Sequence, residues 1–359
     1  HRYDDIASVK EVLESLYELD EYEAEEESIE LDVKETLILK PYQPKKRLKT
    51  SVVVIASFIF CAIFITGYFV IRNFSYSFLP AESDPDLNAK PEAVNRARST
   101  SLSTESDGVL EWRDPGSRED KKTLINFANS GKLDSLRIKA NVVPASAIAF
   151  LKESGLKKLY LKDVYLDDSA MEEVGGIKSL IYLNLYGAKG FTEKGLVSLK
   201  QLTELRELNL GNSTVTDQIF SIISSLEKLR VLDLSRCHNL DGRALKKLLK
   251  LPELQVLRIG GAGFDNGKSV DLSVFEKLKN LKVLFLSHAI VDNDNISQLN
   301  KVPVTRLHFL DVPLNDSGLF KLASHATLRE LILEKSYLVT IDGISEMKDR
   351  CPKLTIEFR

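Results

Sequence analysis

The residue types that most often bind metals or catalyse reactions are scattered along this chain. It has five histidines, no two of them three or four residues apart, and three cysteines with no CxxC pair. They are His1, His238, His288, His308 and His325, with Cys61, Cys237 and Cys351. Zinc sites and nucleophile–base pairs need such side chains at short spacings or in a recognisable motif. We therefore expect no catalytic residue, no metal site and no cofactor within this chain.

Two polar stretches resemble ligand-binding loops only in part. The glycine-rich "IGGAGFDNG", residues 259–267, lacks the GxGxxG spacing and the GK[ST] ending of phosphate-binding loops. The stretch "VDNDN", residues 291–295, lacks the glycine and the distal glutamate of a calcium loop. We interpret both stretches as turns.

A set of aromatic and polar side chains is more informative, because it recurs in step with a short apolar pattern. Most members lie between the leucines of an LxxLxL fragment, and alternate side chains of a strand point to opposite faces. The set comprises Tyr160, Tyr182, Asn184, Tyr186, Asn209, Asp233, Arg258, Phe285 and His308. Exposed tyrosine and arginine are enriched at protein interfaces. We predict that this face binds a protein, a peptide or an envelope polymer.

Ten fragments of this kind follow one another along the C-terminal two thirds of the chain. They begin at residues 133, 156, 180, 205, 229, 254, 281, 304, 328 and 351, in steps of 23 to 27 residues. A sustained period of this length is typical of a solenoid. One such unit cannot bury its own leucines, whereas stacked units share a continuous core.

The pattern resembles the leucine-rich repeat. The resemblance implies an α/β solenoid with short parallel strands on its concave side and helices on its convex side. We expect about ten repeats within residues 117–359. A cap helix in "SREDKKTLINFANSG" would precede them, with Ser117 as its N-cap and Gly131 after its end.

Two details of the repeats concern caps and turns. The polar residue in "GFTEKGL", "TVTDQIF", "NLDGRAL" and "PLNDSGL" is placed to cap a convex helix. Small residues are expected to fill a buried slot after the strands: Ala188, Ser213, Cys237, Ala262, Ala289 and Ser336. Cys351 begins the last fragment, which predicts a core leucine position for it.

The N-terminal third is organised differently. Residues 20–51 run from acidic to basic, and residues 52–71 contain no charged side chain. Twenty helical residues span about 30 Å, the thickness of a hydrocarbon core, so we predict a transmembrane helix there. Basic residues precede this segment, which predicts a cytoplasmic N-terminus and a type II, single-pass protein with its repeats periplasmic or extracellular. Residues 72–116 are rich in proline and polar residues and are expected to form a flexible linker.

The stretch "HRYDDIASVKEVLESLYEL", residues 1–19, resembles the end of a bacterial Hanks-type serine/threonine protein kinase domain. Such domains close with an arginine and an aromatic residue, and then a helix of the form [ST]-x-x-E-[LV]-L-x-x-L. The matching residues here are Arg2, Tyr3, Ser8, Glu11, Val12, Leu13 and Leu16. The resemblance implies that Arg2 forms a structural ion pair in the kinase lobe.

The resemblance also implies a function. The chain would be the sensor region of a receptor-like kinase of the bacterial plasma membrane, working as a homodimer. Its catalytic domain, with ATP and magnesium, would precede residue 1. The alternative is a type II single-pass adhesion or scaffold protein with no enzymatic domain. The formal net charge of −3 and the absence of a strongly basic segment argue against nucleic acid as a partner.

Overall fold

The computed structural model describes residues 102–104, 109–261 and 270–359. The chain divides into two compact units, His1–Ala97 and Arg98–Arg359, and the described residues all belong to the second. Several predictions therefore fall outside the described residues. They are the kinase-like helix with Arg2, the acidic and basic segment, and the apolar stretch at residues 52–71.

A twelve-stranded sheet runs through the described residues, with its strands in sequence order. β1 pairs antiparallel with β2, and each later strand pairs parallel with its predecessor. The strands are β1 (Leu102–Thr104), β2 (Leu110–Trp112), β3 (Ser135–Ile138), β4 (Lys158–Tyr160), β5 (Tyr182–Asn184), β6 (Glu207–Asn209), β7 (Val231–Leu234), β8 (Val256–Gly260), β9 (Val283–Ser287), β10 (Arg306–Leu310), β11 (Glu330–Glu334) and β12 (Thr355–Phe358).

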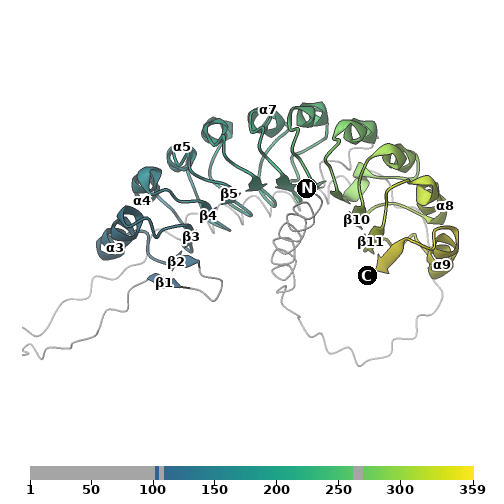
Figure 1. Ribbon diagram of the computed structural model, residues 1–359, viewed down its shortest axis with the longest axis horizontal. Coiled ribbons are helices and arrows are strands. Elements are labelled where there is room, and N and C mark those ends of the chain that lie inside the picture. Colours follow the sequence, from purple (N-terminus) through teal and green to yellow (C-terminus); the bar gives the residue numbers. More distant parts are fainter. Residues whose placement is uncertain (1–101, 105–108, 262–269) are drawn as a thin grey trace, which may run out of the picture. The chain divides into compact units, whose positions relative to one another are not determined.

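The helices lie on the outer side of the arc that the described strands line from within (Figure 1). They are α3 (Arg118–Asn129), α4 (Ala145–Ile148), η1 (Ala149–Glu153), α5 (Asp168–Gly175), α6 (Glu193–Leu196), η2 (Val197–Gln201), α7 (Ile219–Ile223), η3 (Leu245–Lys250), η5 (Leu272–Lys277), η6 (His288–Ile290), η7 (Ile296–Lys301), α8 (Asp316–Phe320), η8 (Lys321–Ser324) and α9 (Ile341–Arg350). The η elements are 3₁₀ helices. Between β7 and β10 the described connections use only 3₁₀ helices, which rise about 2.0 Å per residue and so cross the convex side with few residues.

One column of leucines forms the centre of the core. Its members are register partners on successive strands and are at most 1% exposed: Leu136, Leu159, Leu183, Leu208, Leu232, Leu257, Leu284, Leu307 and Leu331. Burying each of them contributes about 1.5–3 kcal/mol to stability. The predicted leucine-rich repeat solenoid, with concave strands and convex helices, is confirmed.

Three of the predicted caps are confirmed: Ser117, Thr192 and Asn315. The Ser117 hydroxyl accepts a hydrogen bond from the N–H of Asp120 at 3.2 Å, and Gly131 adopts a φ of 68° after the helix. Thr192 caps α6 by accepting from the N–H of Lys194. Asn315 caps α8 by accepting from the N–H of Gly318. The caps expected in "TVTDQIF" and "NLDGRAL" are wrong, because α7 and η3 begin after Gln218 and Ala244, which make no side-chain capping bond.

The sheet begins earlier than the sequence pattern indicated. Strands β1 and β2 lie within the segment assigned to a flexible linker, and β2 pairs with β3. The Trp112 side chain is fully buried and meets the Phe150 ring edge-on, with centroids 6.2 Å apart. Trp112 therefore closes the N-terminal end of the core.

The predicted register of the last repeat is wrong. Leu331 pairs with Ile356, so β12 lies two residues later than the fragment starting at Cys351 implied. Cys351 is the half-buried C-cap residue of α9 rather than a core strand residue. Because α9 has ten residues, the chain enters β12 later than the repeat period predicts.

The structure also corrects the predicted membrane-spanning part of the fold class. Within the described ranges, no helix combines the length and the apolar character needed to cross a bilayer. Among them α3 is the longest with 12 residues, whereas a span needs about twenty. A transmembrane helix, a membrane-spanning chain and the single-pass, type II localisation are therefore not supported. Residues 52–71, on which they were based, lie outside the described residues.

Candidate functional site: the concave face

Seven of the predicted site residues form one row across the concave face. They are register partners on strands β4 to β10: Tyr160, Asn184, Asn209, Asp233, Arg258, Phe285 and His308. Tyr182 and Tyr186 lie two residues before and after Asn184. The repeat length therefore brings together side chains that are far apart in sequence. The row divides into three parts with different chemistry.

The first part is a group of rings and cations that we call the tyrosine platform: Arg137, Lys158, Tyr160, Lys162, Tyr182 and Tyr186. The rings of Tyr160 and Tyr182 are tilted against each other, with centroids 4.8 Å apart. The Arg137 guanidinium lies 5.1 Å from the Tyr160 ring centroid, and the Lys162 ammonium lies 5.4 Å from that of Tyr186. Cations at this distance are attracted to the faces of aromatic rings.

Asn184 holds two of these tyrosines in place. Its side-chain amide donates to the hydroxyl of Tyr182 at 3.2 Å. Its carbonyl oxygen accepts from the backbone N–H of Tyr186 at 2.9 Å. Asn184 is itself buried, so its contribution to the face is to position tyrosines rather than to reach solvent.

The middle of the row is buried and internally hydrogen-bonded. Asn209 accepts from the N–H of Gly211 at 2.8 Å. The Asp233 carboxylate accepts from the N–H and the hydroxyl of Ser235, at 2.8 and 2.6 Å. Such bonds to the backbone two residues ahead are typical of Asn and Asp at turns. Asn209 and Asp233 therefore hydrogen-bond the backbone where β6 and β7 end.

The third part combines charge with an aromatic ring. Arg258 and Phe285 are buried, and the guanidinium lies 5.6 Å from the ring centroid. Phe285 meets the His308 ring edge-on at 4.5 Å, and Nε2 of His308 is 3.2 Å from a carboxylate oxygen of Glu334. Side chains of this end of the face are thus already engaged with one another through ring contacts and the contact of His308 with Glu334.

Glu111 also belongs to this face, although it was not among the predicted site residues. It is the register partner of Arg137, so the row extends to β2. Its fully buried carboxylate pairs with Arg113 at 2.5 Å and with Lys139 at 2.9 Å. Leu110 and Trp112, two residues apart with Glu111 between them, are the signal that would have identified this strand.

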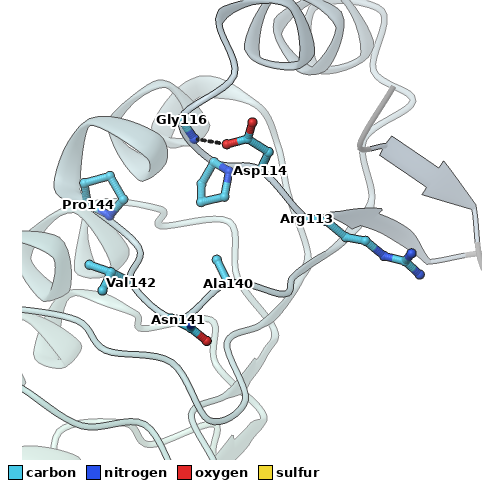
Figure 2. A pocket seen from close by; sticks show the side chains of 8 residues that line it. Arg113, Asp114, Gly116, Ala140, Asn141, Val142 and Pro144 are labelled. Atoms are coloured by element: carbon cyan, nitrogen blue, oxygen red, sulfur yellow. Dashed lines mark hydrogen bonds between the residues drawn. The ribbon is translucent and has the colours of Figure 1, made fainter. Parts of the chain in front are cut away.

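A shallow hollow lies beside the first repeats, at the turns that follow β2 and β3 (Figure 2). Pro115, Ala140, Asn141, Val142 and Pro144 contribute to its lining. In Figure 2 the Arg113 side chain points away from it, and Asp114 bonds the N–H of Gly116 at 3.0 Å. The hollow is open and has few polar groups aimed into it, so the concave face remains the stronger candidate.

The described residues contain no group of three or more His, Cys, Asp or Glu side chains that could hold a metal ion. Cys237 occupies the predicted small slot, fully buried, with its thiol 3.2 Å from the carbonyl of Leu210. Ala188, Ser213 and Ser336 fill equivalent buried slots. Residues 291–295 form a polar turn, in which Asp292 accepts from the N–H groups of Asp294 and Asn295.

No protein family profile matches the sequence. A curated protein of Trypanosoma equiperdum, whose name describes an adenylate cyclase regulatory protein, is 29% identical over 191 residues. That match covers 42% of this chain and spans only 30% of the relative.

Several solved structures resemble the chain. An internalin of Listeria monocytogenes is 21% identical with a TM-score of 0.43, and the match covers 56% of this chain and 55% of that protein. Internalin C2 of Listeria monocytogenes is 22% identical with a TM-score of 0.42, covering 59% and 83%. A leucine-rich repeat protein of Leptospira interrogans is 19% identical with a TM-score of 0.37, covering 64% and 68%.

Proposed function

We propose that this chain binds another protein through its concave face, with the tyrosine platform as the principal contact. A leucine-rich repeat fold suggests a protein-binding role. The observation that carries the proposal is the contact of the Tyr160 and Tyr182 rings, with Arg137 over Tyr160 and Lys162 over Tyr186. Tyrosine and arginine supply much of the binding energy at protein interfaces, and held side chains lose less entropy on binding.

A displayed library of random peptides, selected on the full-length chain, tests this function. The selected peptides are measured against a variant carrying Tyr160→Ala and Tyr182→Ala. A matched control carries Tyr165→Ala, because Tyr165 is half-exposed and packs over Gly190 outside the row. We expect the double variant to bind at least about tenfold more weakly, since truncating a central interface residue costs more than 1 kcal/mol.

The expected control result is unchanged affinity. If the selected peptides bind both variants as tightly as the unmodified chain, the binding surface is elsewhere and the proposal fails. Circular dichroism of each variant checks that the solenoid remains folded.

We also propose that residues 1–19 are the last helix of a serine/threonine protein kinase domain. The arginine–aromatic pair Arg2 and Tyr3, followed by the pattern [ST]-x-x-E-V-L-x-x-L, supports this second proposal. Ligand binding by the repeats would then regulate a kinase, and the alternative is an adhesion or scaffold protein without an enzyme. Reading the coding sequence upstream of residue 1 decides between them. An in-frame start codon shortly upstream, with no kinase motifs between, rejects the kinase proposal.

A further inference from the structure

Charge is distributed unevenly along the concave face. Strands β3 and β4 and the residues just after them contribute four cations: Arg137, Lys139, Lys158 and Lys162. At the other end Glu330 and Glu334 pair with Arg306 and His308, and Glu357 pairs with Arg359. The N-terminal end of the face therefore has an excess of positive charge, and the C-terminal end does not.

Few carboxylates neutralise this positive end. Lys139 pairs with Glu111, while Lys162 is 3.9 Å from the exposed Asp163. Lys158 is exposed, and no carboxylate of the described residues lies within ion-pair distance of it. Glu207, two strands further on, is the nearest carboxylate along that row of the face.

We propose that the tyrosine platform binds an extended, acidic segment of a partner protein; this inference rests on the proposed protein-binding function. Lys158 and Tyr160 occupy alternate positions of β4, about 6.5 Å apart, and Lys162 lies in the turn that follows the strand. Alternate residues of an extended peptide have the same separation. A segment lying along β4 with carboxylates at alternate positions places one opposite Lys158, and Lys162 in the following turn meets another beyond the end of the strand.

The rings make this platform a defined surface. Tyr160 is held between Arg137 and Tyr182, and Asn184 fixes Tyr182 and Tyr186. The apolar part of a bound segment packs on the rings, and its carboxylates meet the cations around them. Ordered aromatic side chains and complementary charge together favour affinity and a fast encounter.

A protein segment fits this surface better than a nucleic acid. Nucleic acid binding depends on many phosphate contacts along a basic path. Here the excess of cations is limited to β3, β4 and the residues just after them, and the face carries Glu207 and then Asp233 on the strands beyond β5. The chain as a whole has a net charge of −3.

The test uses three labelled probes with the full-length chain. One peptide alternates glutamate and glycine, a second has the same composition with its glutamates in blocks, and the third probe is a DNA strand of equal charge. Binding is measured for the unmodified chain and for a variant with Lys158→Glu and Lys162→Glu. The matched control, Lys246→Glu with Lys250→Glu, makes the same charge change on exposed lysines of η3.

We expect the alternating peptide to bind most tightly, with an affinity that falls as salt is raised. The platform variant should weaken it by about tenfold, because two attractions become repulsions, and the control should not. Absence of binding by the alternating peptide, equal losses in both variants, or tighter binding of the DNA overturns the inference. If the displayed library yields concave-face peptides without acidic residues, the protein-binding function stands and this inference alone fails.

Discussion

At the residue scale, Asn209 and Asp233 show that a side chain in the concave row can bond its own backbone instead of reaching solvent. The alternation of the strands placed Asn209 and Asp233 in the same row as Tyr160. Both are buried and bond the backbone two residues ahead. The local patterns "NLG" and "DLS" favour such turns, so these bonds were within reach of sequence reasoning. The burial of Arg258 could not be predicted from the sequence, because it depends on side chains from other repeats.

Cys237 gives a prediction at this scale. Burial raises the pKa of its thiol to about 11 from an ordinary value of 9.0, against opposing hydrogen bonds from Ser213. The folded chain then holds this proton more tightly than the unfolded chain does. Its contribution to stability is complete below pH 9.0 and is lost as the pH rises to about 11. We expect the unfolding free energy of Cys237→Ala to fall less steeply with pH across this range.

Denaturant titrations at several alkaline pH values measure that difference. Cys351→Ala is the control, because Cys351 is a half-buried cap residue. Both variants keep every lysine and tyrosine of the chain, so the difference between them isolates the Cys237 thiol. If the unfolding free energies of the two variants fall with pH at the same slope, the prediction is wrong.

At the element scale, hydrogen bonds between repeats connect the start of one convex helix to the start of the next. The Asp168 carboxylate accepts from the N–H and hydroxyl of Thr192 at 2.6 and 2.7 Å, and from the N–H of Gly195 at 3.1 Å. Asp316 makes the same two bonds to Thr340. The sequence predicted caps within each repeat, but it could not show that one carboxylate serves the neighbouring repeat as well.

Asp168→Ala is predicted to weaken this connection. The bond from the N–H of Thr192 is the main reason that the pKa of Asp168 is lowered below its ordinary value of 3.8. The carboxylate therefore contributes stability above pH 3.8 and loses it as the pH falls through the lowered pKa. We expect a loss of about 1 kcal/mol at neutral pH, typical of a removed helix cap.

Urea unfolding at neutral and acidic pH measures this effect, and the difference from the unmodified chain should shrink in acid. Asp168→Asn is the control, because its amide oxygen can still accept from the N–H groups of Thr192 and Gly195, while the charge is removed and an NH₂ group replaces the oxygen that faces the Thr192 hydroxyl. Asp316→Ala repeats the experiment at an independent copy of the same geometry. A loss that is unchanged in acid would show that the charge of Asp168 is not its source.

At the scale of the whole solenoid, the repeat period was predictable and its two ends were not. A leucine pattern that recurs every 23 to 27 residues predicts one core, because each unit buries the face of the next. The ends depart from the repeat, so the period gives no guidance there. β1 and β2 extend the sheet beyond the first leucine fragment, and the last strand is displaced by two residues.

The N-terminal end gives a prediction for the whole solenoid. Trp112 is fully buried against Phe150, so Trp112→Ala leaves a large cavity in the first layer of the core. Such substitutions cost about 3–5 kcal/mol. Because each repeat contacts only its neighbours, we expect the loss to unfold β1, β2 and α3 locally while β9 to β12 keep their stability.

Hydrogen exchange resolved along the chain measures this gradient. Faster exchange should be greatest in residues 109–129 and should decline over the next two repeats. Trp112→Phe is the matched control, since it keeps an aromatic ring in contact with Phe150 and should confine the change to β2. If exchange accelerates equally from β2 to β12, the solenoid unfolds as one cooperative unit, and the nearest-neighbour description of its stability is wrong.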